Sequence, residues 1–372
     1  MILIGKANTS VRHLQQVVWN SEEERASGCI AGCSASGGQT QSPYIVGGMD
    51  PEDTWLGHSN PAGSTTGNAI AWTAGMAPVA LGAEADGSIV LPSDRAALYS
   101  VRLSPDAISR RGVLPYNGLS DSLGPMTKST EDAALMLNVL LGANYFTQFL
   151  GKSFAGLKIG FLDPVAWAAF PGAVKPNEDY DQQYLTNFTA AMDKIEAAGA
   201  VITRNVTLRK ITSEDDTMCR AIAFHDYGPG FADFTAGCAG QAFIEGAAAN
   251  MNTTTDEEYK EYCRKMTQKT GVLGLDETFA KYHIDVIIGA LTGRSVSVYD
   301  LAGYPVGTMP FGYARFNGRP IGVAVVAPKH RDDPIIGTMS AWEGLLGPRQ
   351  PPQQLVQGSE EIKGEGLQVS QI

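Results

Sequence analysis

Two short turns that combine glycine with a hydroxyl group carry serines 24 positions apart and could support nucleophilic chemistry. The first turn spans residues 62–67 and contains Ser64, and the second spans residues 85–88 and ends at Ser88. A serine beside glycine can aim its oxygen and several backbone N–H groups at one point, which suits attack on a carbonyl carbon. The alternative is that both are ordinary turns, because glycine and serine are common turn residues.

The chain between the two turns consists of small and apolar residues. Residues 68–76 suit a helix, in which three alanines and a glycine form a small-residue face. Residues 77–82 (APVALG) favour a short buried strand. A helix with so small a face lets backbones approach closely, so we expect this stretch in the middle of a domain.

The two turns resemble the serine-bearing segments of the amidase signature family, whose serine hydrolases cleave carboxamide C–N bonds. Ser64 falls on the family's cis-serine and Ser88 on its nucleophile, and their spacing fits the family register without a gap. Other segments that resemble the family are ILIGKAN at 2–8, GGQTQ at 37–41, VLP at 113–115, GPMTK at 124–128, AGYP at 302–305 and GRPIGV at 318–323. The resemblance covers about residues 1–346, firmly at both ends and weakly from 150 to 280.

This resemblance implies a fold and a catalytic site. The fold is of the α/β class, an amidase-signature fold with a central mixed β-sheet flanked by helices on both faces, here N-terminally truncated. Ser88 would attack the substrate carbonyl carbon, and Ser64 would relay the proton. The oxyanion hole would be formed by the backbone N–H groups of Ala85, Asp86, Gly87 and Ser88. We expect the two serine hydroxyls to lie within hydrogen-bonding distance of each other.

The catalytic base of the family is a lysine, and the sequence lacks it at the matching place. In the family this lysine lies on a strand upstream of the GKTN segment, and the chain begins at that segment. Lys6 matches the lysine of GKTN, which is not the base, and the next lysine is Lys128. Arg12 and Arg25 cannot substitute, because a guanidinium does not deprotonate in a protein. A serine hydroxyl needs a base, so the sequence predicts activity that is impaired or depends on a substitute base.

Other departures from the family pattern concern the geometry of the turns. Thr65 and Thr66 replace a serine and a glycine beside the cis-serine, and Asp86 replaces a glycine in the oxyanion turn. If position 66 needs a positive φ, a β-branched residue there strains the turn. The five histidines have no diagnostic neighbours and are expected to be ordinary surface or core residues.

Length, charge and cysteine content restrict the class of protein. The chain has 372 residues, enough to bury a sizeable core, and its net charge of −11 argues against nucleic-acid or anionic-membrane partners. The five scattered cysteines are predicted to be free thiols, and with no signal-peptide pattern at the start they indicate a cytoplasmic, reducing compartment. No phosphate-binding glycine loop or metal-ligand cluster occurs, so we expect no cofactor and no metal. The expected partner is a small-molecule amide substrate.

Short apolar runs and capping residues mark the expected elements, and Ser129 and Gly142 are expected to begin and end one helix. Strands are expected at 2–4, 157–162, 201–208, 284–288, 306–311 and 321–327, and helices at 129–141, 181–198 and 334–346. The strand–helix–strand order over residues 157–208 favours parallel pairing. Residues 213–280 are expected to be mostly helical, and residues 20–62 to form a long loop region.

Residues 1–346 are predicted to form one domain. Its core is expected at 1–150 and 284–346, with a variable substrate-shaping region at 151–283 and a disordered tail at 347–372. Two functions follow from the sequence. The first is an amidase-type serine hydrolase that acts on the non-peptide C–N bond of a small molecule. The alternative is a pseudoenzyme or truncated product that keeps the fold, with a ligand-binding role or none.

Overall fold

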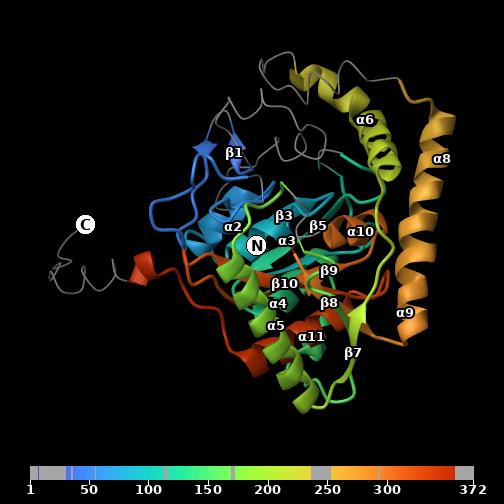
Figure 1. Cartoon of the computed structure of the whole chain (residues 1–372). Helices are drawn as coiled ribbons and strands as arrows, with labels where there is room; N and C mark the ends of the chain where they lie inside the picture. The colour runs from blue at the N-terminus through green and yellow to red at the C-terminus, as the bar shows by residue number, and fades with distance from the viewer. Residues whose placement is uncertain are drawn as a thin grey trace.

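The computed structural model describes residue 7 and residues 31–34, 37–54, 56–111, 113, 116–168, 172–235, 253–291 and 294–356 (Figure 1). Within these ranges, helices cover both faces of one large β-sheet, which confirms the predicted α/β class. The strand expected at residues 2–4 and the start of the predicted loop region lie outside the described residues.

The described strands of the large sheet run in the order β3-β5-β4-β9-β10-β8-β6-β7. Their bounds are β3 (Ala80–Glu84), β4 (Tyr99–Arg102), β5 (Ser122–Thr127), β6 (Lys158–Leu162), β7 (Val201–Val206), β8 (Val286–Ala290), β9 (Val306–Tyr313) and β10 (Pro320–Val326). Strand β6 runs parallel to β7 and β8, and the other pairs are antiparallel. The short strands β1 (Cys33–Ser34) and β2 (Gly38–Gln39) form a separate antiparallel pair.

Helices lie on both faces of the sheet and along one side of it. They are α2 (Thr66–Thr73), α3 (Val90–Arg95), α4 (Thr130–Leu141), the 3-10 helix η2 (Phe146–Phe149), α5 (Glu178–Ala197), α6 (Ser213–Thr235), α8 (Asp256–Met266), the π-helix η3 (Thr267–Asp276), α9 (Glu277–Tyr282), α10 (Ser295–Leu301) and α11 (Asp333–Leu346). Helices α4, α5 and α11 share one buried cluster with the strands, and α3, α9 and α10 share another. The expected helical character of residues 213–280 is therefore confirmed where the chain is described.

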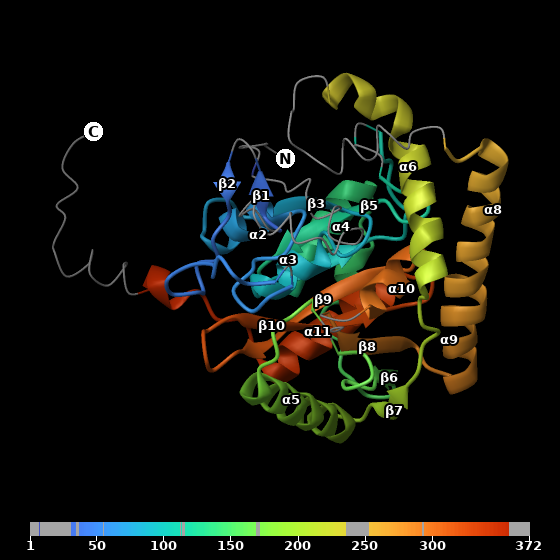
Figure 2. The ribbon, with the colours of Figure 1, turned by 45° about the horizontal axis from the view of Figure 1, so that its top comes forward.

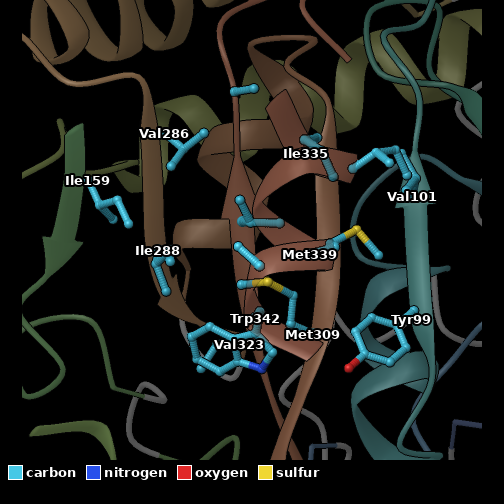
Figure 3. Close-up of a cluster of buried hydrophobic side chains, with 14 of the residues drawn as sticks. Tyr99, Val101, Ile159, Val286, Ile288, Met309, Val323, Ile335, Met339 and Trp342 are labelled. Carbon is cyan, nitrogen blue, oxygen red and sulfur yellow. The ribbon is translucent and has the colours of Figure 1, made fainter. Parts of the chain in front are cut away.

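Alternating side chains of the central strands explain the two buried clusters. Val286 and Ile288 of β8 belong to the cluster under α4, α5 and α11, whereas Ile287 between them belongs to the opposite cluster. Successive side chains of a strand point to opposite faces. Figure 3 shows the first cluster, in which Trp342 of α11 and Met309 of β9 lie close to the strand residues.

Capping residues mark the ends of α4 and the start of α5. The Ser129 side chain accepts a hydrogen bond from the Asp132 N–H at 3.1 Å and starts α4, and Gly142 ends it with a left-handed φ of 61°. Asn177 caps α5 in the same way. The parallel pairing of β6 with β7 across α5 confirms the prediction from the strand–helix–strand order.

Some expectations about the elements differ from the structure: α5 begins three residues earlier than expected, and β8 lies two residues later than expected. Strand β3 was expected to be buried, but it lies at one edge of the sheet and exposes Leu81 and Ala83. Helix α2 starts two residues earlier than expected and ends three earlier. The start of the predicted disordered tail is bound to the domain: Arg349 donates to the Ala97 carbonyl at 2.7 Å, and Gln350 donates to the Tyr313 hydroxyl at 2.7 Å.

Helices α6, α8 and α9 lie together along one side of the sheet, as both views show (Figures 1 and 2). The Thr255 side chain and Glu258 form a capping box at the start of α8. Among the described helices, none is long and apolar enough to cross a membrane.

Candidate active site

Ser88 lies in the turn between β3 and α3. Its side chain is buried, with 3% of the residue exposed. The preceding Gly87 has a φ of 82°, a conformation that favours glycine. A Cβ at position 87 would lie 2.6 Å from Leu91 Cδ1, so this turn requires glycine for space as well as for backbone conformation.

Ser64 lies in the turn that leads into α2. The peptide bond between Gly63 and Ser64 is cis, and Ser64 is half-buried. Ala62 has the positive φ of this turn, 57°, whereas Thr66 is the first residue of α2 and donates its hydroxyl to the Ala62 carbonyl. Position 66 therefore does not need a positive φ, and the strain considered for a β-branched residue there does not arise.

Backbone contacts join the two turns. The Thr65 N–H donates to the Ser88 carbonyl at 3.0 Å, and the Thr65 hydroxyl donates to the Ala83 carbonyl at 3.1 Å. Among the hydrogen bonds of the described residues, none links the Ser64 hydroxyl to the Ser88 hydroxyl, although we expected this contact. The backbone bonds hold the two turns side by side.

The backbone N–H groups of the second turn divide into two sets. Within the described ranges, the N–H groups of Ala85, Asp86 and Ser88 donate to no protein acceptor. The Gly87 N–H, by contrast, donates to Asp300 Oδ2 at 2.7 Å. The prediction that Gly87 offers its N–H to an oxyanion is therefore not met in this structure, because a buried carboxylate already accepts that hydrogen.

The charged side chains behind the turn were not singled out from the sequence. They are Glu84, Arg102 and Asp300, all at most 2% exposed. Burial raises the pKa of Glu84 and of Asp300, and the neighbouring Arg102 lowers both. The structure shows their importance through burial: Arg102 is the charged residue of β4, a strand that is buried along its whole length.

The Asp86 side chain faces α10. The Ser297 hydroxyl donates to the two Asp86 carboxylate oxygens at 2.9 and 3.1 Å. Nearby, Arg294 donates to both carboxylate oxygens of Asp216 at 2.9 Å, which ties α10 to α6. Burial raises the pKa of Asp86, and the Ser297 hydrogen bond lowers it.

A second buried charged cluster supports the loop that leads into the Ser64 turn. His58 Nε2 lies 3.1 Å from the Lys175 carbonyl, and His58 Nδ1 lies 3.0 Å from Arg319 Nη1. Because the guanidinium can only donate, Nδ1 is the acceptor and His58 is neutral with its hydrogen on Nε2. Arg319 and Arg95 share Asp94, whose Oδ2 lies 3.6 and 3.1 Å from them.

The buried, neutral His58 predicts that the free energy of unfolding falls at acid pH. Burial lowers the pKa of His58, and the charge of Arg95 lowers it further. Below the ordinary histidine pKa of about 6.5, the folded state therefore binds fewer protons than the unfolded chain. The stabilisation that neutral His58 contributes is complete above a pH of about 6.5. It is lost as the pH falls toward the pKa of His58 in the folded state. We expect His58→Gln to remove up to about 1.4 kcal/mol per pH unit from the acid-side slope of the unfolding free energy.

Urea unfolding between pH 7.5 and 5.5 measures this slope. His283→Asn, at an exposed histidine with a φ of 51°, is the matched control and should leave the slope unchanged. Equal slopes for wild type and His58→Gln would contradict the neutral, hydrogen-bonded histidine.

The cysteines differ from the prediction in one respect. Cys33 is disulfide-bonded, whereas Cys219 and Cys263 are free. The expectation of five free thiols is therefore wrong. The cytoplasmic location stays a prediction. Among the described residues, no group of three or more His, Cys, Asp or Glu side chains could hold a metal ion.

Comparison with known proteins identifies the family. Residues 34–287, more than half of the chain, match the Amidase family. The chain belongs to the amidase family. It is 23% identical over 365 residues to a glutamyl-tRNA(Gln) amidotransferase subunit of Deinococcus radiodurans, covering 84% of this chain and 72% of that protein. It is 35% identical over 111 residues to a probable amidase of Arabidopsis thaliana, covering 30% of this chain and 20% of that protein.

Solved structures of amidases share the fold. Peptide amidase from Stenotrophomonas maltophilia superimposes with a TM-score of 0.71 and 24% identity, covering 87% of this chain and 71% of that chain. A bacterial aryl acylamidase of the amidase signature enzymes superimposes with a TM-score of 0.64 and 16% identity, covering 86% and 70%. The predicted family and its mixed sheet are therefore confirmed.

Proposed function

We propose that this amidase-family chain hydrolyses the C–N bond of a small-molecule carboxamide, with Ser88 as nucleophile and Ser64 as proton relay. The observation that carries the proposal is the 3.0 Å hydrogen bond from the Thr65 N–H to the Ser88 carbonyl, which holds the two serine turns side by side. Membership of the amidase family supports the same reaction class.

The proposed reaction proceeds through an acyl-enzyme. The Ser88 oxygen attacks the carbonyl carbon while its proton passes to Ser64 and on to a basic group, which the reaction requires. The oxyanion that forms is stabilised by the N–H groups of Ala85, Asp86 and Ser88, which have no protein acceptor among the described residues. The C–N bond breaks, the amine leaves with a proton, and water then hydrolyses the ester at Ser88.

Ammonia release from a panel of primary carboxamides tests this function. The panel contains an aliphatic amide, an aromatic amide and a peptide with a C-terminal amide. Ser88→Ala should lower the rate by about 10³-fold or more, because it removes the nucleophile. The matched control is Ser93→Ala, since Ser93 lies on α3, is fully buried and has a hydroxyl without a hydrogen-bond partner in the described part of the chain.

The outcomes separate the two functions considered from the sequence. Ammonia release that Ser93→Ala keeps and Ser88→Ala loses supports the hydrolase. Release that survives Ser88→Ala contradicts Ser88 as nucleophile. Binding of the amides by a folded wild type that releases no ammonia supports the pseudoenzyme instead.

A further inference from the structure

Three charged side chains from three different elements meet behind the Ser88 turn. Glu84 ends β3, Arg102 ends β4 and Asp300 belongs to α10. Arg102 Nε lies 3.2 Å from Asp300 Oδ1 and 3.8 Å from Glu84 Oε1, and none of the three side chains is exposed to solvent. The second carboxylate oxygen of each acid points to the backbone of the turn.

The two carboxyl groups bind the turn on either side of Ser88. Asp300 Oδ2 accepts the Gly87 N–H at 2.7 Å, immediately before the serine. Glu84 Oε2 accepts the N–H groups of Ile89 and, at 2.8 Å, Val90, immediately after it. The path of the backbone through Ser88 is thus set by two buried acids.

The charges of this cluster do not balance if both acids are ionised. The Nη atoms of Arg102 donate to the backbone carbonyls of Tyr304, Ser120 and Asp300, so its single positive charge faces two carboxyl groups through Nε. Two further acids of the described residues lie near the cluster: Asp86 of the turn, which Ser297 holds and whose charge Arg294 offsets, and the more distant Asp332. An uncompensated negative charge away from water is costly.

We propose that Glu84 and Asp300 share one proton, which keeps the cluster neutral, and that both are positioning residues of the Ser88 turn. The second part rests on the proposed function, because it assigns the turn to the nucleophile. The pKa shifts of the two acids agree with a bound proton. Burial raises the pKa of both acids, and the Glu84 carboxylate raises the pKa of Asp300 further.

A double-mutant cycle tests the shared proton without any activity. Glu84→Gln and Asp300→Asn each leave one carboxylate for Arg102, so each should change the unfolding equilibrium constant by less than about tenfold. The double variant leaves Arg102 buried without a counter-charge and should unfold at least about a hundredfold more readily than the two single effects predict. Glu84→Gln combined with Asp285→Asn, at an exposed carboxylate, should be additive within about twofold.

The pH dependence of unfolding gives a second readout. The folded cluster holds one proton that the unfolded carboxyl groups, with pKa values of about 4, release. The wild type should therefore lose stability as pH rises above about 5. Its unfolding equilibrium constant should rise by up to about tenfold more per pH unit than that of either single variant. Additive effects in the cycle, or equal pH slopes in wild type and both single variants, would overturn the shared proton.

The positioning role is tested by comparing Asp300→Asn with Asp300→Ala. Asparagine keeps an oxygen that can accept the Gly87 N–H, and alanine does not. Alanine should lower the rate at which a fluorophosphonate labels Ser88 by about 10²-fold, and asparagine by less than tenfold, because small displacements of a reacting group have large effects. Equal losses in both variants, or none in either, would overturn the role.

A wild type that is not labelled would count against the proposed function and not against the cluster. The positioning role is then judged by hydrogen exchange of the Gly87 amide, measured by mass spectrometry. Asp300→Ala should raise its exchange rate at least about tenfold, since the amide loses its buried acceptor, while Asp300→Asn should not. Protection that survives in the alanine variant would contradict the role of Asp300.

Discussion

Gly87→Ala is expected to lower the labelling rate of Ser88 by a fluorophosphonate about 10²-fold, because the turn cannot accept a Cβ at this position. The φ of 82° disfavours every L-residue, and the new atom would lie 2.6 Å from Leu91 Cδ1 and 2.9 Å from Leu91 Cγ. The Leu91 side chain must move to relieve both contacts, and the disfavoured φ strains the turn that carries Ser88. The strain should also lower the unfolding free energy by about 1–3 kcal/mol.

Gly142→Ala is the matched control for this variant. Gly142 ends α4 with a φ of 61°, and a Cβ there would have no heavy atom within 4 Å. The Gly142→Ala variant has the conformational cost of a positive φ but no steric clash, and it lies away from the two serine turns. The rate at which a fluorophosphonate labels Ser88 should therefore equal that of the wild type. An unchanged labelling rate in Gly87→Ala would contradict the view that this glycine sets the position of the serine.

Asp94→Asn is expected to lower the unfolding free energy by about 3–5 kcal/mol at pH 7.5, because two buried guanidinium groups lose their counter-charge. Asp94 lies 3.1 Å from Arg95 and 3.6 Å from Arg319, and all three side chains are at most 2% exposed. Burial raises the pKa of Asp94 to about 6, and Arg95 opposes this shift. At pH 7.5 the carboxyl group is therefore ionised, and the variant removes a full charge.

Asn at position 94 keeps an oxygen for the Gly322 N–H, so the comparison isolates the charge. Asp193→Asn is the control, since Asp193 pairs with Arg204 at 3.0 Å on the surface and is 63% exposed. That variant should cost less than about 1 kcal/mol. Urea unfolding measures both, and a loss at position 94 no larger than that at position 193 would show that the buried arginines have other compensation.

Local signals in the sequence predicted the elements that depend on local physics. Ser129 and Gly142 cap α4 where the sequence places them, and the β6-α5-β7 unit follows from its apolar periodicity. The two serine turns were found because each combines glycine with serine and because their spacing resembles that of the amidase signature family. These features are determined by short stretches of neighbouring residues.

The features that could not be predicted from the sequence depend on contacts between residues far apart in the chain. The occupation of the Gly87 N–H depends on Asp300, which is 213 positions away. The edge position of β3 depends on which strands pair beside it, and the binding of Arg349 depends on a carbonyl 252 positions away. No local pattern around Gly87, Ala80–Glu84 or Arg349 contains this information.

Tandem mass spectrometry of the fluorophosphonate-treated protein tests the central claim most directly, because it locates the modified oxygen. We expect a single adduct on Ser88 in the wild type and in Ser93→Ala, and none in Ser88→Ala. An adduct on another serine, or a folded wild type with no adduct on Ser88, would contradict the assignment of Ser88 as the activated nucleophile.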